Sequence, residues 1–146
     1  MPKPNFRYLP HTADVAFVAS GKDFKGVVEN SATAMFNLMF EIKKLEASKA
    51  KTKTIRIHES ANNRQDLAWF VLQEIVSKVD QRGVQALRFK VNSITEAQGK
   101  VKLRGCIFYK KQKEYLALFD VKAVTPSGFT LARKNGKWSI RAILDV

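Results

Sequence analysis

Two aspartates stand out in the sequence because each lies at one end of an apolar, strand-like segment. Asp14 closes a polar corner that begins at His11 and precedes the apolar residues 15–19, and Asp145 closes the last apolar run, one residue before Val146. Carboxylate oxygens suit hard cations such as magnesium, calcium or manganese much better than zinc. The two acids, with the α-carboxylate of the last residue, therefore predict a hard-cation site. A simple turn, in which Asp14 accepts bonds from nearby N–H groups, is the alternative interpretation.

A lysine within an apolar segment is the third candidate. Lys122 lies in the run DVKAVT (120–125), where a cation either reaches solvent at a sheet edge or pairs with a carboxylate. His11 and His58 are the two histidines of the chain, which excludes a zinc site with three histidine ligands. Cys106 is the one cysteine, which excludes an internal disulfide, and its mid-strand position is typical of a small buried hydrophobe. Phosphate-binding glycine loops, nucleophile elbows and C-x-x-C pairs are absent from the sequence.

Hydrophobic periodicity predicts the elements that must position these residues. Apolar residues recur at three- and four-residue steps over 24–42 and again over 67–79, which indicates two amphipathic helices. Asp23 is the expected N-cap of the first helix. Gly83 is expected to end the second helix in the left-handed conformation.

The other apolar segments alternate with polar residues, as strands do. They cover residues 5–9, 15–19, 54–58, 87–91, 100–109, 115–125, 130–132 and 138–145. Gln98-Gly99 and Asn135-Gly136 predict hairpin turns, and the lysine-rich residues 43–53 predict an exposed loop. We expect one α+β domain over residues 1–146, built in two layers, with two helices packed on one face of a mixed, mostly antiparallel sheet.

The chain is strongly basic. Its 26 Lys and Arg residues against 13 Asp and Glu give a formal charge of +13 and a pI near 10.0 over 146 residues. Such a charge favours contact with polyanions, although solvated surface lysines explain it equally well. The basic residues gather in segments 43–53 and 110–113, and neither is interleaved with the aromatics of an RNA-recognition sheet. The chain has no apolar leader and no run of the roughly 18 apolar residues that a membrane span needs. We therefore expect a soluble cytoplasmic protein with no membrane partner.

The segments that hold these candidates also resemble the archease family. The matching segments are HTADV (11–15), ENSATAMFNLM (29–39), DLAWFVLQE (66–74), VKAVT (121–125) and WSIRAILDV (138–146). They follow one another in the family's order over nearly the whole chain. Two departures stand out: Pro126-Ser127 lies where family members commonly have Tyr-His, and Phe40-Glu41 lies where an aspartate often follows the methionine of the first helix.

The resemblance implies a function and a set of residues. Archeases are accessory factors, not stand-alone catalysts, of RtcB-type RNA ligases that act in tRNA splicing and RNA repair. They promote guanylylation of the ligase by GTP and support multiple turnover. By motif match, Asp14, Asp145 and Val146 would hold a divalent metal (calcium, or magnesium or manganese), and Lys122 and His11 would be functional positions.

Two other classes of function stay open. The first is a basic module that binds RNA or tRNA, or acts as a chaperone, in which both aspartates are structural. The second is a small metal-dependent hydrolase that uses Asp14, Asp145 and His11. The hydrolase is the least favoured, since an active site normally gathers more convergent polar groups than these.

Overall fold

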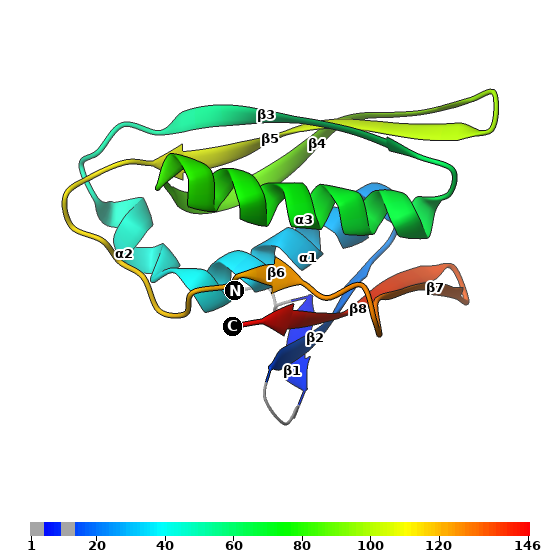
Figure 1. Cartoon of the computed structure of the whole chain (residues 1–146), viewed down its shortest axis with the longest axis horizontal. Helices are drawn as coiled ribbons and strands as arrows, with labels where there is room; N and C mark the ends of the chain where they lie inside the picture. The colour runs from blue at the N-terminus through cyan, green and yellow to red at the C-terminus, as the bar shows by residue number, and fades with distance from the viewer. Residues whose placement is uncertain (1–4, 10–13) are drawn as a thin grey trace.

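Two antiparallel sheets lie on either side of a layer of helices in the computed structural model, which describes residues 5–9 and 14–146 (Figure 1). The strands are β1 (Phe6–Leu9), β2 (Val15–Gly21), β3 (Lys53–Ala61), β4 (Gln85–Ala97), β5 (Lys100–Lys110), β6 (Ala123–Val124), β7 (Thr130–Lys134) and β8 (Lys137–Asp145). The helices are α1 (Phe24–Met39), α2 (Ile42–Ala47) and α3 (Arg64–Arg82). Among the described residues, no helix combines the length and apolar character that a membrane crossing requires.

The five-stranded sheet joins the beginning of the chain to its end. Its order is β1-β2-β8-β6, and β7 also pairs with β8. In the β2–β8 pair, Val15 lies opposite Leu144 and Gly21 lies opposite Trp138. The start of β2 and the end of β8 therefore meet at one end of the sheet.

The three-stranded sheet is a continuous antiparallel unit of order β3-β5-β4. Gln98 and Gly99 turn β4 into β5 with φ of 53° and 74°, as the Gln-Gly pair predicts. Asn135 and Gly136 turn β7 into β8 in the same way, with φ of 54° and 75°. The β4–β5 register shifts between Ala86 and Arg88 and again between Val91 and Ser93.

The helix ends follow their capping residues. The Asp23 carboxylate accepts the Gly26 N–H at 2.7 Å, which satisfies one of the free amides in the first turn of α1. Asn63 does the same for Asp66 at the start of α3. Gly83 ends α3 with φ of 60°, in the predicted left-handed conformation.

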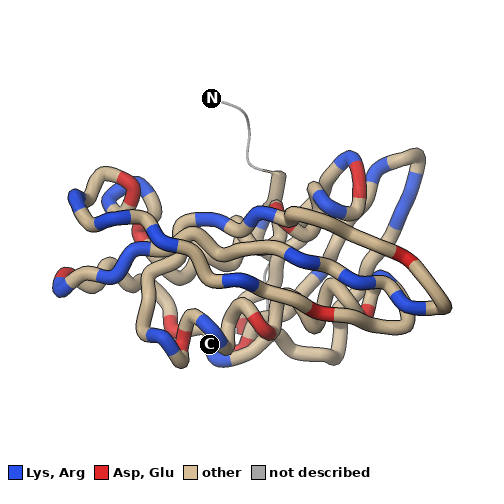
Figure 2. Tube along the Cα trace, turned by 90° about the horizontal axis from the view of Figure 1, so that it is seen from above, with Lys and Arg blue, Asp and Glu red and all other residues tan. Residues whose placement is uncertain are grey.

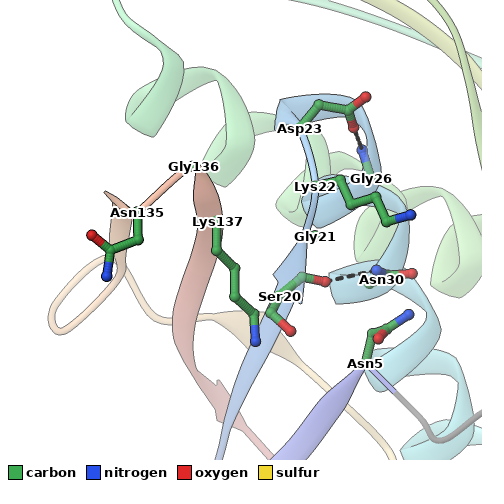
Figure 3. A pocket seen from close by; sticks show the side chains of 10 residues that line it. All are labelled: Asn5, Ser20, Gly21, Lys22, Asp23, Gly26, Asn30, Asn135, Gly136 and Lys137. Atoms are coloured by element: carbon green, nitrogen blue, oxygen red, sulfur yellow. Dashed lines mark hydrogen bonds between the residues drawn. The ribbon is translucent and has the colours of Figure 1, made fainter.

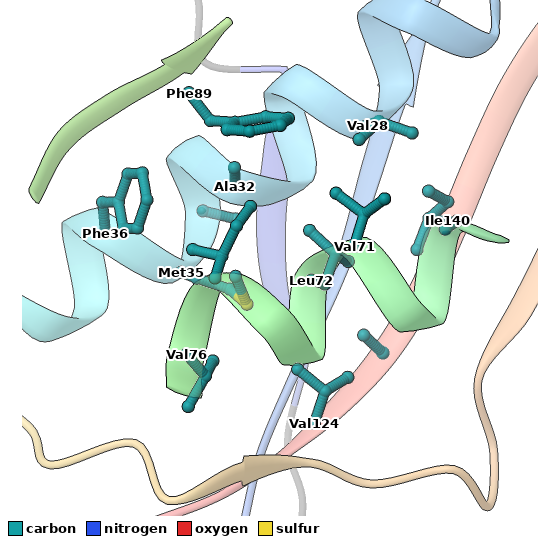
Figure 4. Close-up of a cluster of buried hydrophobic side chains, with 14 of the residues drawn as sticks. Val28, Ala32, Met35, Phe36, Val71, Leu72, Val76, Phe89, Val124 and Ile140 are labelled. Atoms are coloured by element: carbon teal, nitrogen blue, oxygen red, sulfur yellow. The ribbon is translucent and has the colours of Figure 1, made fainter. Parts of the chain in front are cut away.

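One hydrophobic core joins both sheets to the helix layer. Phe36 and Met35 of α1 and Leu72 of α3 are fully buried, and they lie between Phe89 of the three-stranded sheet and Ile140 of the five-stranded sheet (Figure 4). The two long helices, α1 and α3, therefore bury apolar side chains toward both sheets, which explains how 146 residues hide so many large apolar groups.

The α+β class is confirmed, and the layering differs from the expected arrangement. The strands split into two sheets with the long helices between them, so the helices do not cover one face of a single sheet. Residues 42–47 form α2 where a loop was predicted, because Leu45 is buried against Leu87 and Leu116. The strand predicted over 115–125 reduces to β6 and an isolated bridge from Ala117 to Phe40.

Candidate functional site

Asp14 and Asp145 meet at one end of the five-stranded sheet. Asp14 directly precedes β2, and Asp145 is the last residue of β8. Because Val15 lies opposite Leu144, continuing the antiparallel register by one residue puts the two aspartates side by side. Leu144 faces the core, so the alternation of side chains along a strand turns Asp145, and Asp14 opposite it, toward the sheet face that lies away from the core. We call this pair the acidic tip.

Strand β6 brings Lys122 to the acidic tip. Ala123 lies opposite Asp145, and the Lys122 N–H donates to the Asp145 carbonyl at 2.7 Å. Lys122 and Asp145 are both exposed, and Asp14 is half-buried. Val146 is half-buried and packs against the core. Four of the five residues that the sequence singled out therefore gather in one place.

His11 is the fifth predicted residue, and it lies outside the residues that the structure describes. Its neighbouring hairpin is nevertheless anchored. The Tyr8 hydroxyl of β1 donates to the Ala34 carbonyl of α1 at 2.9 Å, and burial raises the pKa of that hydroxyl above 10.0. The β1–β2 hairpin, which leads to Asp14, is thereby held against the helix layer.

Two side chains of α3 hold β6 in place. The Trp69 Nε1–H donates to the Val124 carbonyl at 2.9 Å, and the Gln73 Oε1 accepts the Val124 N–H at 2.8 Å. These residues lie one helical turn apart, so both face the same two-residue strand. Sequence reasoning did not assign them a role. Both lie in the DLAWFVLQE segment. A polar residue, Gln73, among apolar residues of this helix was the sequence feature that could have indicated such a role.

The donor chemistry of the acidic tip fits a hard divalent cation. Like charges on directly opposed strand residues repel, and a cation held between them removes that repulsion. Two side-chain carboxylates do not complete a coordination sphere of six or more oxygens. Within residues 5–9 and 14–146, no group of three His, Cys, Asp or Glu residues is placed to hold a metal. The remaining oxygens would have to come from groups such as the Val146 carboxylate and water.

The segment that leads into Lys122 presents apolar side chains to solvent. Tyr115 is 58% exposed, Leu118 54% and Phe119 51%. Their backbone is nevertheless fixed: the N–H of Leu118 donates to the Met39 carbonyl at 2.8 Å, and that of Phe119 to the Leu38 carbonyl at 3.3 Å. An apolar patch on a fixed backbone is typical of a surface that another protein covers. We call Tyr115, Leu118 and Phe119 the apolar loop.

A cavity of about 630 Å³ opens at the other end of the five-stranded sheet (Figure 3). Ser20 and Gly21 at the end of β2 line it, together with Lys137 at the start of β8. The sheet register therefore separates this cavity from the acidic tip by the full length of the β2–β8 pair. Within it, the Asn30 amide donates to the Ser20 carbonyl at 2.7 Å, and the Asp23 carboxylate accepts the Gly26 N–H at 2.7 Å.

The comparisons with known proteins agree on one family. The model of the archease protein family matches residues 6–146. A protein archease from Methanothermobacter thermautotrophicus is 30% identical over 142 residues, which cover 97% of this chain and 98% of the relative. A solution structure from Methanobacterium thermoautotrophicum superposes with a TM-score of 0.83 at 27% identity and covers 99% of this chain and 100% of that one. A crystal structure of a Thermotoga maritima archease, described as a possible chaperone, shares the fold with a TM-score of 0.59 at 16% identity, over 100% of this chain and 98% of its own.

Proposed function

This chain belongs to the archease family, and on that premise we propose that it is an accessory protein that activates an RtcB-type RNA ligase by promoting its guanylylation. The observation that carries the proposal is the meeting of Asp14, Asp145 and Lys122 at one end of a sheet. These are the residues for which the family resemblance implies a role. They come from three separate segments of the chain, and the fold brings them to one exposed point.

In this proposal Asp14 and Asp145 hold a divalent cation with the help of the Val146 carboxylate. When bound there, the cation would supply positive charge toward a nucleotide phosphate. The carboxylates and Lys122 are exposed or half-buried, so a partner can reach them directly. Lys122 balances the charge of the acids and offers a second cation to an anionic group.

The apolar loop serves as the docking surface for the ligase in this proposal. An accessory protein must bind its client before it can act on it, and exposed apolar patches with aromatic members are typical of such contacts. The loop runs directly into Lys122, so a protein that covers Leu118 and Phe119 also meets the acidic tip.

The test separates docking from activation. We expect Asp145→Asn and Asp14→Asn to lower single-turnover guanylylation of the ligase more than about tenfold, as loss of metal-site groups typically does. Both variants should still bind the ligase. Leu118→Ser with Phe119→Ser should instead weaken ligase binding itself.

Glu46→Gln is the matched control, since it removes one exposed carboxylate from α2. It should leave both binding and guanylylation unchanged. In parallel, calcium, magnesium or manganese should raise the unfolding temperature of the wild type but not of Asp145→Asn. Full stimulation by both aspartate variants would refute the proposal.

A further inference from the structure

The outer face of the three-stranded sheet carries a concentration of positive charge. Helices α1 and α3 pack on its inner face, and its outer face looks away from the rest of the molecule (Figure 1). Six basic side chains alternate outward along its three strands, and we call them the basic sheet face: Arg56, Arg88, Lys90, Lys100, Lys102 and Arg104. All six are exposed. Figure 2 views this sheet from above, and lysine and arginine recur along the strands nearest the viewer.

The acids on the three strands of this sheet point away from the basic sheet face. Strands β3, β4 and β5 contain two acids, Glu59 and Glu96. Their register partners are the buried Leu103 and Val101, so both alternate toward the helix side of the sheet. Within the described chain, the ion pairs of lysine and arginine involve other residues, as in the pair between Glu96 and Arg64. The charge of the basic sheet face is therefore available to a partner.

The face suits a nucleic acid better than a protein. Protein interfaces have an apolar centre depleted of charge, whereas nucleic-acid interfaces are polar and strongly positive. None of the large apolar side chains exposed on the described chain lies on β3, β4 or β5. The outward ring of Phe108 is covered by Arg88, whose guanidinium carbon lies 4.1 Å from the ring centroid. This contact fixes one cation on the face and leaves little aromatic surface for base stacking.

We propose that the basic sheet face binds the phosphodiester backbone of single-stranded RNA, without reading its sequence. Lys100, Lys102 and Arg104 follow one another at every second position of β5, about 6.8 Å apart. That step is comparable with the distance between successive phosphates of an extended strand. Next to this row, Arg56 and Arg104 line a shallow hollow of about 450 Å³ that opens across β3, β5 and β4.

This site is separate from the acidic tip and from the ligase proposal. The tip lies on the five-stranded sheet, and the helix layer stands between the two sheets. RNA binding is therefore measured with this protein alone, and its success or failure is independent of guanylylation.

The first experiment measures the salt dependence of binding by fluorescence anisotropy, with a labelled oligouridine of about 12 nucleotides as the probe. Uridine stacks weakly, so the signal reports backbone contacts. If about four phosphates are neutralised, the logarithm of affinity falls with a slope of about −2.8 against the logarithm of salt concentration. A fourfold rise in salt then weakens binding about 50-fold. A slope near zero would overturn the proposal.

The second experiment locates the contact with charge-matched variants. Arg56→Gln with Arg104→Gln removes two charges from the face and should bring the slope to about −1.4. Lys134→Gln with Lys137→Gln removes two exposed charges from the β7–β8 hairpin of the other sheet and should bind as the wild type does. If both double variants lost RNA affinity equally, binding would depend on net charge alone and the proposal would be refuted.

The third experiment uses the unmodified protein. Cys106, the single cysteine of the chain, lies half-buried in the hollow of the basic sheet face. Bound oligouridine should slow its alkylation, and high salt should restore the original rate. Unchanged alkylation at saturating RNA would refute the location. Displacement of the RNA by polyglutamate of matched charge at equal affinity would assign the face to an acidic protein instead.

Discussion

Replacing Gln73 by Leu tests whether α3 fixes the strand that brings Lys122 to the acidic tip. Gln73 Oε1 accepts the N–H of Val124, whose side chain is fully buried. Leucine has a similar volume and no acceptor, so the N–H loses its partner within the protein. β6 has two residues and one β-strand neighbour, β8. Apart from the Gln73 bond, it is held by the Trp69 bond to the Val124 carbonyl and by the bonds of the flanking Lys122 and Thr125 N–H groups to β8.

The magnitude follows from the cost of an unsatisfied amide. A buried donor that loses its acceptor typically costs about 1–3 kcal/mol. With an unfolding entropy of roughly 2.1 cal/mol/K per residue, a chain of this length should lose about 3–10 °C in Tm. Loosening of β6 also displaces Lys122, so stimulation of the ligase should fall even where the protein is fully folded.

Amide hydrogen exchange gives the direct readout. The Val124 amide should be protected in the wild type and exchange faster in Gln73→Leu, while the amides of α3 keep their protection. Gln73→Glu is the matched control, because its carboxylate retains an acceptor at the same position. The reasoning is refuted if Val124 stays equally protected in Gln73→Leu, or if Gln73→Glu loses protection to the same extent.

Two further substitutions test the packing and the electrostatics of the three-stranded sheet. In Gly105→Ala the new Cβ would lie 2.5 Å from Phe89 Cζ and 2.6 Å from the Lys90 carbonyl oxygen. We expect this clash to lower the free energy of unfolding by about 1–3 kcal/mol, measured by thermal unfolding. Phe89→Leu should restore only part of this loss, and a wild-type Tm for Gly105→Ala alone would contradict the clash. Burial, with the nearby Glu74 carboxylate, raises the pKa of Glu59 above 4.5. Folding therefore disfavours the ionised form of Glu59. This lowers the free energy of unfolding at neutral pH, and the loss is relieved as the pH falls and the carboxyl is protonated. Glu59→Gln should therefore be more stable than the wild type at pH 7 in urea unfolding, with a difference that shrinks toward pH 4.5; a constant offset across that range would count against it.

Local patterns predicted most of the elements, because caps and turns act over a few residues. Asp23, Gly83 and the Asn135-Gly136 turn hold the positions that their chemistry predicts. The separation into two sheets could not be predicted in this way. It depends on which strands pair over long distances, and the alternation of apolar and polar residues is the same in either sheet. Likewise, the N–H and carbonyl of Val124 in β6 bond to side chains of α3, Gln73 and Trp69, and no local pattern predicts such long-range bonds.

The candidate site also depends on strand pairing that local sequence patterns do not predict. Asp14 and Asp145 were conspicuous in sequence because each ends an apolar run, but only the β2–β8 register makes them neighbours. Their function as metal ligands stays a prediction. A family resemblance selects residues, whereas pairing determines which of them can act together.

The alternation of side chains along the strands determines where part of the net charge of +13 lies on the surface. Counted along the sequence, the lysines gather in segments 43–53 and 110–113. In the fold, Lys110 is only 5% exposed, with its Nζ donating to the carbonyls of Glu46 and Ser48 at 3.1 and 2.8 Å. Six other exposed basic residues, which are spread along the sequence, gather on the outward face of three adjacent strands, and the two acids of those strands face the other way. The period of a strand therefore brings charges that are separated in sequence onto one surface that a polyanion can contact. The acidic tip lies on the other sheet, so a phosphate backbone held on the basic sheet face is kept apart from the carboxylates that would repel it.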